Sequence, residues 1–187
     1  YRRDELTYTL NQSKASALIL SQEYKHDSMI AIADSIYNKE TVPYLNSVIV
    51  LEENNTTSSS IPPNWLLWND LRTAGLSNIL KNQLHKREST LKNYPHLPAN
   101  IQYTSGTTGK PKAAMLSHHN ILNNGFFIGE KLNYGPTDKV VIPVPLFHCF
   151  GQVLGNIACA SHGSTMIYPS ALFDVESTLH AVQKEKA

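Results

Sequence analysis

Short apolar runs alternate with amphipathic stretches along the first half of this chain. Residues 17–20 and 48–51 contain only apolar side chains, as expected of strands that are covered on both faces of a sheet. Between these runs, apolar residues recur at helical spacing after Asp27, which we predict to be the N-cap of a helix. The pattern predicts a strand–helix–strand unit with parallel strands and a right-handed crossover.

Two more helical regions are predicted in the first half. Leu6 and Leu10 have the spacing of one helix face near the start of the chain. After a polar loop at residues 52–63, apolar residues within 65–84 predict a helix-rich stretch. The predicted order is therefore helix, strand, helix, strand, helix.

The second half repeats this alternation. Its predicted strands lie at residues 101–103, 140–142 and 165–168, and its predicted helices begin after Ser117, at Gln152 and after Asp174. In the last helix we expect Val175, Leu179 and Val182 to face inward. Alternating elements favour an α/β fold of layered sheets with helices on both faces.

The length of 187 residues suggests about one domain. Pro95 and Pro98 mark a junction inside it, because proline disfavours the continuation of a helix or a central strand. We expect approximate sub-units at residues 1–94 and 95–187.

The composition argues against several classes of function. Hydrophobic residues make up 41% of the chain, which is enough for a core. The formal net charge is +1, so nothing points to a nucleic acid partner or an anionic membrane surface. No apolar run approaches the roughly 20 residues needed to span a bilayer. The two cysteines, Cys149 and Cys159, do not form a disulfide framework, and their apolar neighbours predict buried thiols. The oligomeric state is left open.

The densest cluster of candidate chemistry is a loop of small, hydroxylated and basic residues. Its members are Thr104, Ser105, Gly106, Thr107, Thr108, Gly109, Lys110, Pro111 and Lys112. Glycine lets backbone N–H groups approach an anion closely, and lysine adds a mobile positive charge suited to phosphate. A flexible linker is the alternative reading, as at residues 54–60. The 104–112 loop differs because a predicted strand precedes it and the apolar run 113–116 follows it.

The loop does not match the two common nucleotide motifs. The common phosphate loop of nucleotide-binding proteins needs a glycine five positions before Gly-Lys-Ser/Thr. Here Thr104 occupies that position, and Pro111 follows Lys110. The dinucleotide motif also fails, because Gly106 and Gly109 have no third glycine at the required spacing.

Thr-Ser-Gly-Thr-Thr-Gly-Lys-Pro-Lys at 104–112 resembles the signature loop of the adenylate-forming acyl-CoA synthetases. Pro-Val-Pro-Leu-Phe-His-Cys-Phe-Gly at 143–151 resembles a second motif of that family. The resemblance implies part of the large N-terminal domain of such an enzyme. It implies ATP, Mg²⁺ and coenzyme A as cofactor and co-substrates, and a fatty acid or other carboxylic acid, with medium chain length as the expectation.

The resemblance also implies roles for individual residues. Lys112 would stabilise the leaving pyrophosphate, the loop hydroxyls would bind phosphate oxygens, and the loop glycines would admit the backbone. His148 would lie near the acyl pocket, where Gly151 would leave room for the acyl chain. A histidine packed as a core side chain is the alternative for His148. Adjacent histidines such as His118 and His119 do not face the same way on a helix, so we expect no metal site there.

Two departures from the family pattern qualify the assignment. Ala113 stands where the family usually has glycine, which would cost roughly 1 kcal/mol if that position needs a positive φ. The family's adenine, ribose, magnesium and catalytic-lysine positions are not found in residues 1–187, so we expect an internal fragment that is inactive alone. A non-catalytic nucleotide-binding paralogue and an incomplete, inactive fragment remain alternatives. The resemblance favours mitochondria, with cytoplasm or peroxisomes as alternatives.

Overall fold

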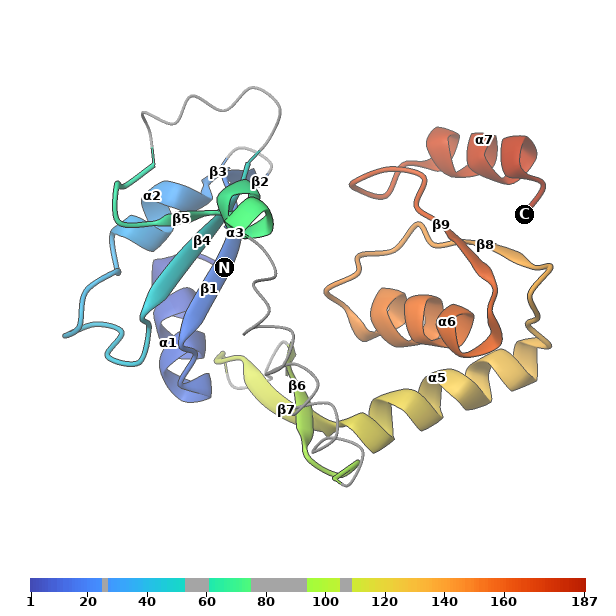
Figure 1. Cartoon of the computed structure of the whole chain (residues 1–187), viewed down its shortest axis with the longest axis horizontal. Helices are drawn as coiled ribbons and strands as arrows, with labels where there is room; N and C mark the ends of the chain where they lie inside the picture. Colours follow the sequence, from blue (N-terminus) through green and yellow to red (C-terminus); the bar gives the residue numbers. More distant parts are fainter. Residues whose placement is uncertain (25–26, 53–60, 75–93, 105–108) are drawn as a thin grey trace. The chain divides into compact units, whose positions relative to one another are not determined.

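The computed structural model describes residues 1–24, 27–52, 61–74, 94–104 and 109–187. The chain forms two compact units (Figure 1). The first comprises Tyr1–Ser89 and Tyr103–Ala113, and the second comprises Thr90–Gln102 and Ala114–Ala187. Within the described ranges, no helix combines the length and the apolar character needed to cross a bilayer.

A three-stranded sheet forms the centre of the first unit. Its strands are β1 (Ala17–Ser21), β4 (Ser47–Leu51) and β5 (Leu66–Leu67), in the order β1-β4-β5. β1 pairs with β4 in parallel, and β4 pairs with β5 in parallel. The predicted parallel strand–helix–strand unit is therefore confirmed.

Helix α1 (Arg3–Ser13) precedes β1 in the chain, and helix α2 (Met29–Asp34) lies between β1 and β4. The predicted N-cap of α2 was one residue early. The Ser28 hydroxyl accepts the N–H of Ala31 at 3.2 Å, so Ser28 is the cap. Asp27 belongs instead to a short antiparallel pair formed by β2 (Glu23–Tyr24) and β3 (Asp27–Ser28). Ser28 pairs in the same strand and still caps α2, so the pairing does not by itself exclude a cap position.

The helix-rich prediction for residues 65–84 was wrong at its start. Leu66 and Leu67 form strand β5, because they complete the edge of the parallel sheet beside β4. Helix α3 follows at Trp68–Ala74. The rest of the predicted stretch, from residue 75 on, lies outside the described residues.

The core of the first unit lies where α1, α2 and the following loop pack on β4. Its buried hydrophobic residues are Leu10, Ala33, Ile36, Val42, Leu45, Val48, Val50 and Trp65. The expected coverage of both strand faces does not hold for β1 in the described chain, since Ile19 is 53% exposed. A continuous apolar run identifies a strand, but it does not show which face of that strand is covered by other residues.

The second unit is built from short strand pairs and helices. Its elements are β8 (Lys139–Val141), β9 (Thr165–Ile167), α5 (His118–Leu132), the π-helix η2 (Phe150–Ile157), α6 (Ala158–His162) and α7 (Val175–Glu185). β8 and β9 pair in parallel. The helix predicted from Gln152 thus starts two residues earlier and changes from π to α geometry at Ala158.

Two strands connect the units along the chain, β6 (Pro98–Thr104) and β7 (Lys112–Ser117). They pair as a two-stranded sheet. Ser117 is the N-cap of α5, as predicted, and its hydroxyl accepts the Asn120 N–H at 3.1 Å.

The last helix, α7, has the predicted N-cap, but the helix face that is buried differs from the predicted one. Asp174 Oδ1 accepts the Ser177 N–H at 2.7 Å, and hydrogen bonds from Ser177 hold the pKa of Asp174 below its ordinary value. Ala181 is the buried residue of α7. The three side chains expected to face inward are exposed instead: Val175, Leu179 and Val182. In a helix the apolar stripe shows amphipathicity, but contacts decide which part of it is covered.

Glycines form the buried face of α5. A Cβ on Gly125 would overlap the side chain of Ile157, and a Cβ on Gly129 would overlap the ring of His162. The absence of side chains at these positions lets α5 approach η2 and α6 closely. Leu122, on the same helix, is 55% exposed.

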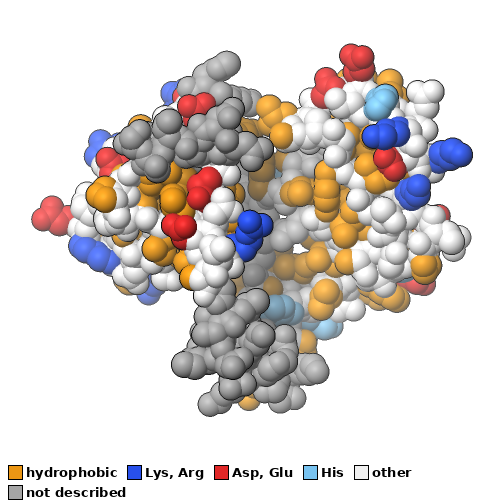
Figure 2. Space-filling model, turned by 45° about the horizontal axis from the view of Figure 1, so that its top comes forward, with side chains coloured by type: hydrophobic (Ala, Val, Ile, Leu, Met, Phe, Trp, Pro, Cys, Tyr) orange, Lys and Arg blue, Asp and Glu red, His pale blue; other side chains and the backbone are white. Residues whose placement is uncertain are grey.

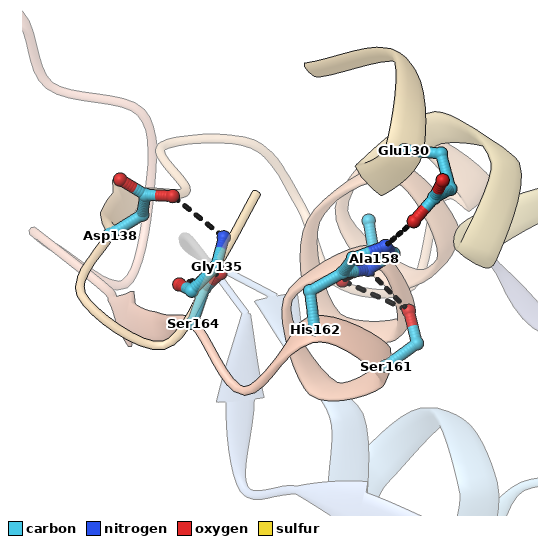
Figure 3. Close-up of polar contacts among 7 residues, drawn as sticks. All are labelled: Glu130, Gly135, Asp138, Ala158, Ser161, His162 and Ser164. Carbon is cyan, nitrogen blue, oxygen red and sulfur yellow. Dashed lines mark hydrogen bonds and ion pairs between the residues drawn. The ribbon is translucent and has the colours of Figure 1, made fainter. Parts of the chain in front are cut away.

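His162 joins α5 and α6 through polar contacts (Figure 3). Its side chain is 8% exposed, and Nε2 lies 3.2 Å from Glu130 Oε1 on α5. Nδ1 lies 3.0 Å from the carbonyl oxygen of Ala158 and 3.0 Å from Ser161 Oγ. Both ring nitrogens therefore face oxygen atoms, and the ring also stacks on Phe126 with centroids 5.2 Å apart.

A Gly129→Ala substitution tests the close approach of α5 to α6. Overpacking against the buried His162 ring should outweigh the helix propensity that alanine adds, for a net loss of about 1–2 kcal/mol in the free energy of unfolding. Urea unfolding followed by circular dichroism measures this change. The control is Gly135→Ala, where a Cβ would meet only Asp138 Oδ2, at 3.8 Å. Equal losses in the two variants would contradict the close contact.

Candidate functional site

The predicted phosphate loop is framed by paired strands. β6 ends at Thr104 and β7 begins at Lys112, so the loop leaves and re-enters one two-stranded sheet. The structure describes Gly109, Lys110 and Pro111 between them. The remaining predicted members lie outside the described residues: Ser105, Gly106, Thr107 and Thr108.

Gly109 has the left-handed backbone conformation that favours glycine, with a φ of 85°. No atom of the described residues lies within 4 Å of the Cβ position, so the backbone conformation is what favours glycine here. Backbone turns that include positive φ angles form concave groups of N–H donors for anions. The one described glycine of the loop thus has a conformation suited to binding an anion.

Ala113 carries no cost at the position where the family usually has glycine. It lies inside strand β7, and it is not among the described residues with positive φ. Extended backbone accepts any side chain, so the strain considered for Ala113 does not arise.

Helix α1 braces both ends of the loop within the first unit. The Tyr103 hydroxyl donates to the carbonyl oxygen of Thr9 at 2.9 Å. Lys110 Nζ lies 5.4 Å from the ring centroid of Tyr8, a cation–π contact. Sequence reasoning missed the two α1 residues, because they lie about a hundred positions before the loop and no local pattern links them to it.

The two loop lysines differ in their surroundings. Lys110 is held beside the Tyr8 ring. Lys112 is exposed at the first position of β7, and its ammonium group has no hydrogen-bond or ion-pair partner within the described part of the chain.

The second motif forms a tight turn in the second unit. The His148 N–H donates to the carbonyl oxygen of Pro145 at 3.2 Å, and the His148 carbonyl accepts the Gln152 N–H at 3.0 Å. The Phe150 N–H donates to His148 Nδ1 at 3.1 Å. In the neutral ring this bond places the proton on Nε2, which leaves an N–H donor at the far side of an exposed side chain. His148 is therefore not a core histidine.

Gly151 is required by the same turn. A Cβ there would come within 2.5 Å of the Pro145 carbonyl oxygen. This crowding accounts for glycine independently of any acyl chain. Gly151 also lies in the first turn of η2, and π-helical turns are frequent at functional sites.

Two side chains of β6 bind the turn, and sequence reasoning missed both. Gln102 Nε2 donates to the carbonyl oxygen of Phe147 at 2.9 Å, and Asn100 Nδ2 donates to Gln152 Oε1 at 3.3 Å. The alternation of a strand places Asn100 and Gln102 on one face. Two amides at alternate positions of a predicted strand were the available signal for this contact.

The turn also presents apolar surface. Phe147 is 71% exposed and Phe150 is 53% exposed, on either side of His148. Hydrophobic side chains also reach the surface at several places on the face drawn in Figure 2. Within the described ranges, no group of three or more histidine, cysteine or acidic side chains is placed to hold a metal ion.

The two cysteines have opposite environments, which corrects the prediction that both are buried. Cys159 is fully buried, and burial raises the pKa of its thiol. Cys149 is exposed, and its Sγ lies 3.7 Å from His148 Nδ1. Apolar neighbours in sequence do not bury Cys149, because the turn points its segment outward.

Comparison with known proteins adds an independent line of evidence. The family model described as AMP-binding enzyme matches residues 1–187. The acyl-CoA ligase SID4 of Ajellomyces capsulatus is 35% identical over 190 residues, covering 100% of this chain and 30% of its own. The mitochondrial medium-chain acyl-CoA ligase ACSF2 of Danio rerio is 36% identical over 199 residues, covering 100% and 31%. The chain thus spans about a third of the length of these relatives.

Solved structures agree on the fold. The apo structure of MbtA from Mycobacterium smegmatis superposes with a TM-score of 0.73 at 19% identity, over 99% of this chain and 31% of that one. The predicted α/β fold class is therefore confirmed.

Alkylation of the native protein at neutral pH should modify Cys149 well before Cys159. The raised pKa of Cys159 lowers its thiolate fraction, and the thiolate is the reactive form. Timed iodoacetamide treatment followed by peptide mass spectrometry measures both rates. In denaturant the two thiols should react similarly, whereas equal rates in the native protein would contradict the burial of Cys159.

Proposed function

Because the chain belongs to the AMP-binding enzyme family, we propose that it supplies the phosphate-binding loop of an acid–thiol ligase acting on a fatty acid. In the first step a carboxylate oxygen attacks the α-phosphorus of ATP, and the bond to pyrophosphate breaks. In the second step the sulfur of coenzyme A attacks the acyl carbonyl carbon, the thiol proton is lost, and AMP leaves. The whole reaction is a proposal, because this chain spans only about a third of the length of the relatives named as ligases.

One observation carries the proposal. Lys112 is an exposed cation without a partner in the described residues, and it closes a loop in which Gly109 has a positive φ. Pyrophosphate gains negative charge as it leaves, so a preorganised cation and N–H groups lower the barrier of the first step. The exposure of Lys112 and the positive φ of Gly109 support this role for the loop.

The roles of the other loop residues rest on the family resemblance. Thr107 and Thr108 would donate hydroxyl hydrogen bonds to phosphate oxygens, and Gly106 would admit the backbone. Thr104, at the end of β6, would hold the start of the loop. Mg²⁺, when bound with ATP, would neutralise phosphate charge, and we assign no residue of this chain as its ligand.

The turn at residues 145–152 is proposed to contact the acyl substrate. His148 would use its Nε2–H to position the carboxylic acid, while the exposed rings of Phe147 and Phe150 supply apolar surface. Gly151 serves the turn first, and any room it leaves for an acyl chain is a consequence.

Medium chain length and mitochondrial location are the finer parts of the proposal. The support is the 36% identity to a relative named as a mitochondrial medium-chain acyl-CoA ligase. The other relative is named only as an acyl-CoA ligase, so chain length has to be measured.

Lys112→Ala tests the leaving-group role in the full-length protein. A charge-assisted contact that strengthens in the transition state is worth about 2–4 kcal/mol, so acyl-adenylate formation should slow by roughly 30- to 1000-fold. Thioester formation from supplied acyl-adenylate should stay nearly unchanged, because no pyrophosphate leaves in that step. Pyrophosphate release and thioester formation are measured separately.

Lys110→Ala is the matched control, since Lys110 is held beside Tyr8. Its effect on adenylation should be several-fold at most. An equal loss in both half-reactions of Lys112→Ala would assign Lys112 to folding instead. ATP binding without any AMP formation by the unmodified protein would favour the non-catalytic alternative.

A series of straight-chain fatty acids tests the substrate. Each buried methylene contributes about 0.8 kcal/mol, so kcat/KM should rise roughly fourfold per methylene until the pocket is filled. The maximum is expected at medium chain length. A maximum at long-chain acids would refute the medium-chain assignment while leaving the ligase reaction intact.

A further inference from the structure

Two histidines that are far apart in sequence meet beside the strands that carry the loop. His96 lies two residues before β6, and His119 lies in the first turn of α5. Their ring centroids are 4.8 Å apart, with an angle of 36° between the ring planes. Both side chains are exposed and both residues belong to the second unit.

Backbone hydrogen bonds hold the two histidines together. The His119 N–H donates to the carbonyl oxygen of Pro95 at 2.9 Å. The His118 N–H donates to the carbonyl oxygen of Leu97 at 3.2 Å. The residues on both sides of His96 are therefore tied to the start of α5, so the approach of the rings is built into the fold.

The start of α5 is not available to an anion. The N–H groups of His118 and His119 already donate to carbonyl oxygens, and the Asn120 N–H donates to Ser117 Oγ at 3.1 Å. A helix N-terminus binds anions through free N–H groups, and the first three here are occupied. Within the described residues no hydrogen bond engages the ring nitrogens of His96 and His119, and imidazole nitrogens are metal ligands.

The separation of the rings suits a shared metal ion. Imidazole nitrogen binds zinc at about 2.0–2.1 Å, which puts the centroids of two rings on one tetrahedral ion roughly 5 Å apart. The observed 4.8 Å is close to this value. The His96 ring borders a pocket of about 290 Å³ that is also lined by Pro98, Met115, Ser117 and Asn120. This volume leaves room for the ion and for water at its other positions.

We propose that His96 and His119 form a binding site for a borderline divalent cation such as Zn²⁺, Ni²⁺ or Cu²⁺. Imidazole nitrogen suits these ions, whereas Mg²⁺ and Ca²⁺ prefer carboxylate and carbonyl oxygens. Among the described residues, no carboxylate lines the pocket. The site is therefore distinct in chemistry from any Mg²⁺ that accompanies ATP.

The bound ion would link the segment before β6 to the first turn of α5. Because β7 leads directly into α5, this link would join the start of β6 to the end of β7. The pair considered from sequence was His118 with His119, whose side chains leave the helix in different directions. The partner of His119 is instead a residue 23 positions earlier (119 − 96).

Metal titration of the tag-free full-length protein tests the site. Zn²⁺ and Ni²⁺ are titrated by calorimetry, each without ATP, and Mg²⁺ serves as the hard-ion control. His96→Ala and His119→Ala should each weaken Zn²⁺ binding at least tenfold. They should also abolish the rise in melting temperature that Zn²⁺ causes in the unmodified protein. Mg²⁺ should show no binding that depends on either histidine.

His118→Ala and His180→Ala are the matched controls, one adjacent to the site and one on α7. Both should bind Zn²⁺ as the unmodified protein does. Loss of binding in His118→Ala but not in His96→Ala would overturn the proposed pair. Should His96→Ala fail to fold, histidine ¹⁵N spectra of the unmodified protein decide: Zn²⁺ must shift the resonances of His96 and His119, and unchanged resonances refute the site.

Discussion

A loop of glycine and hydroxyl residues can hold a polyphosphate only if both of its ends are fixed, because its N–H groups must already point at the anion. Here the pairing of β6 with β7 fixes them, since one strand ends at Thr104 and the other begins at Lys112. The Tyr103 hydroxyl adds a bond to α1 next to the loop. Ordering a residue costs about 1–2 kcal/mol, so ends that are ordered in advance reduce what the ligand must supply.

The same arrangement separates the roles of the two lysines. A cation over an exposed aromatic ring gains about 0.5–1 kcal/mol from it, and Lys110 has such a contact with Tyr8. A phosphate would have to compete with that contact for Lys110 but not for Lys112. The two lysines have the same chemistry and lie two positions apart, and only their neighbours in space distinguish them.

Local chemistry explains what could be predicted from the sequence. The caps at Ser117 and Asp174 and the parallel pairing of β1 with β4 follow from nearby side chains and from continuous apolar runs. The choice of Ser28 over Asp27 could not be predicted, because both residue types are good caps and the two positions are adjacent. Contacts between distant segments were also inaccessible, including Tyr103 with Thr9 on α1. For the candidate site, the sequence predicts the motif residues, but it did not predict the side chains that contact them.

Glycine shows why a motif has to be interpreted position by position. Gly109 is required by its φ, with open space around it, whereas Gly151 is required by the Pro145 carbonyl oxygen close to where a Cβ would lie. At Ala113 neither condition holds, because the residue lies in extended backbone within β7. The glycine that the family pattern places there is therefore dispensable in this chain, while alanine at Gly151 would open the turn that holds His148. Positions 113 and 151 look alike in a motif. They differ because the Pro145 carbonyl oxygen leaves no room for a Cβ at position 151.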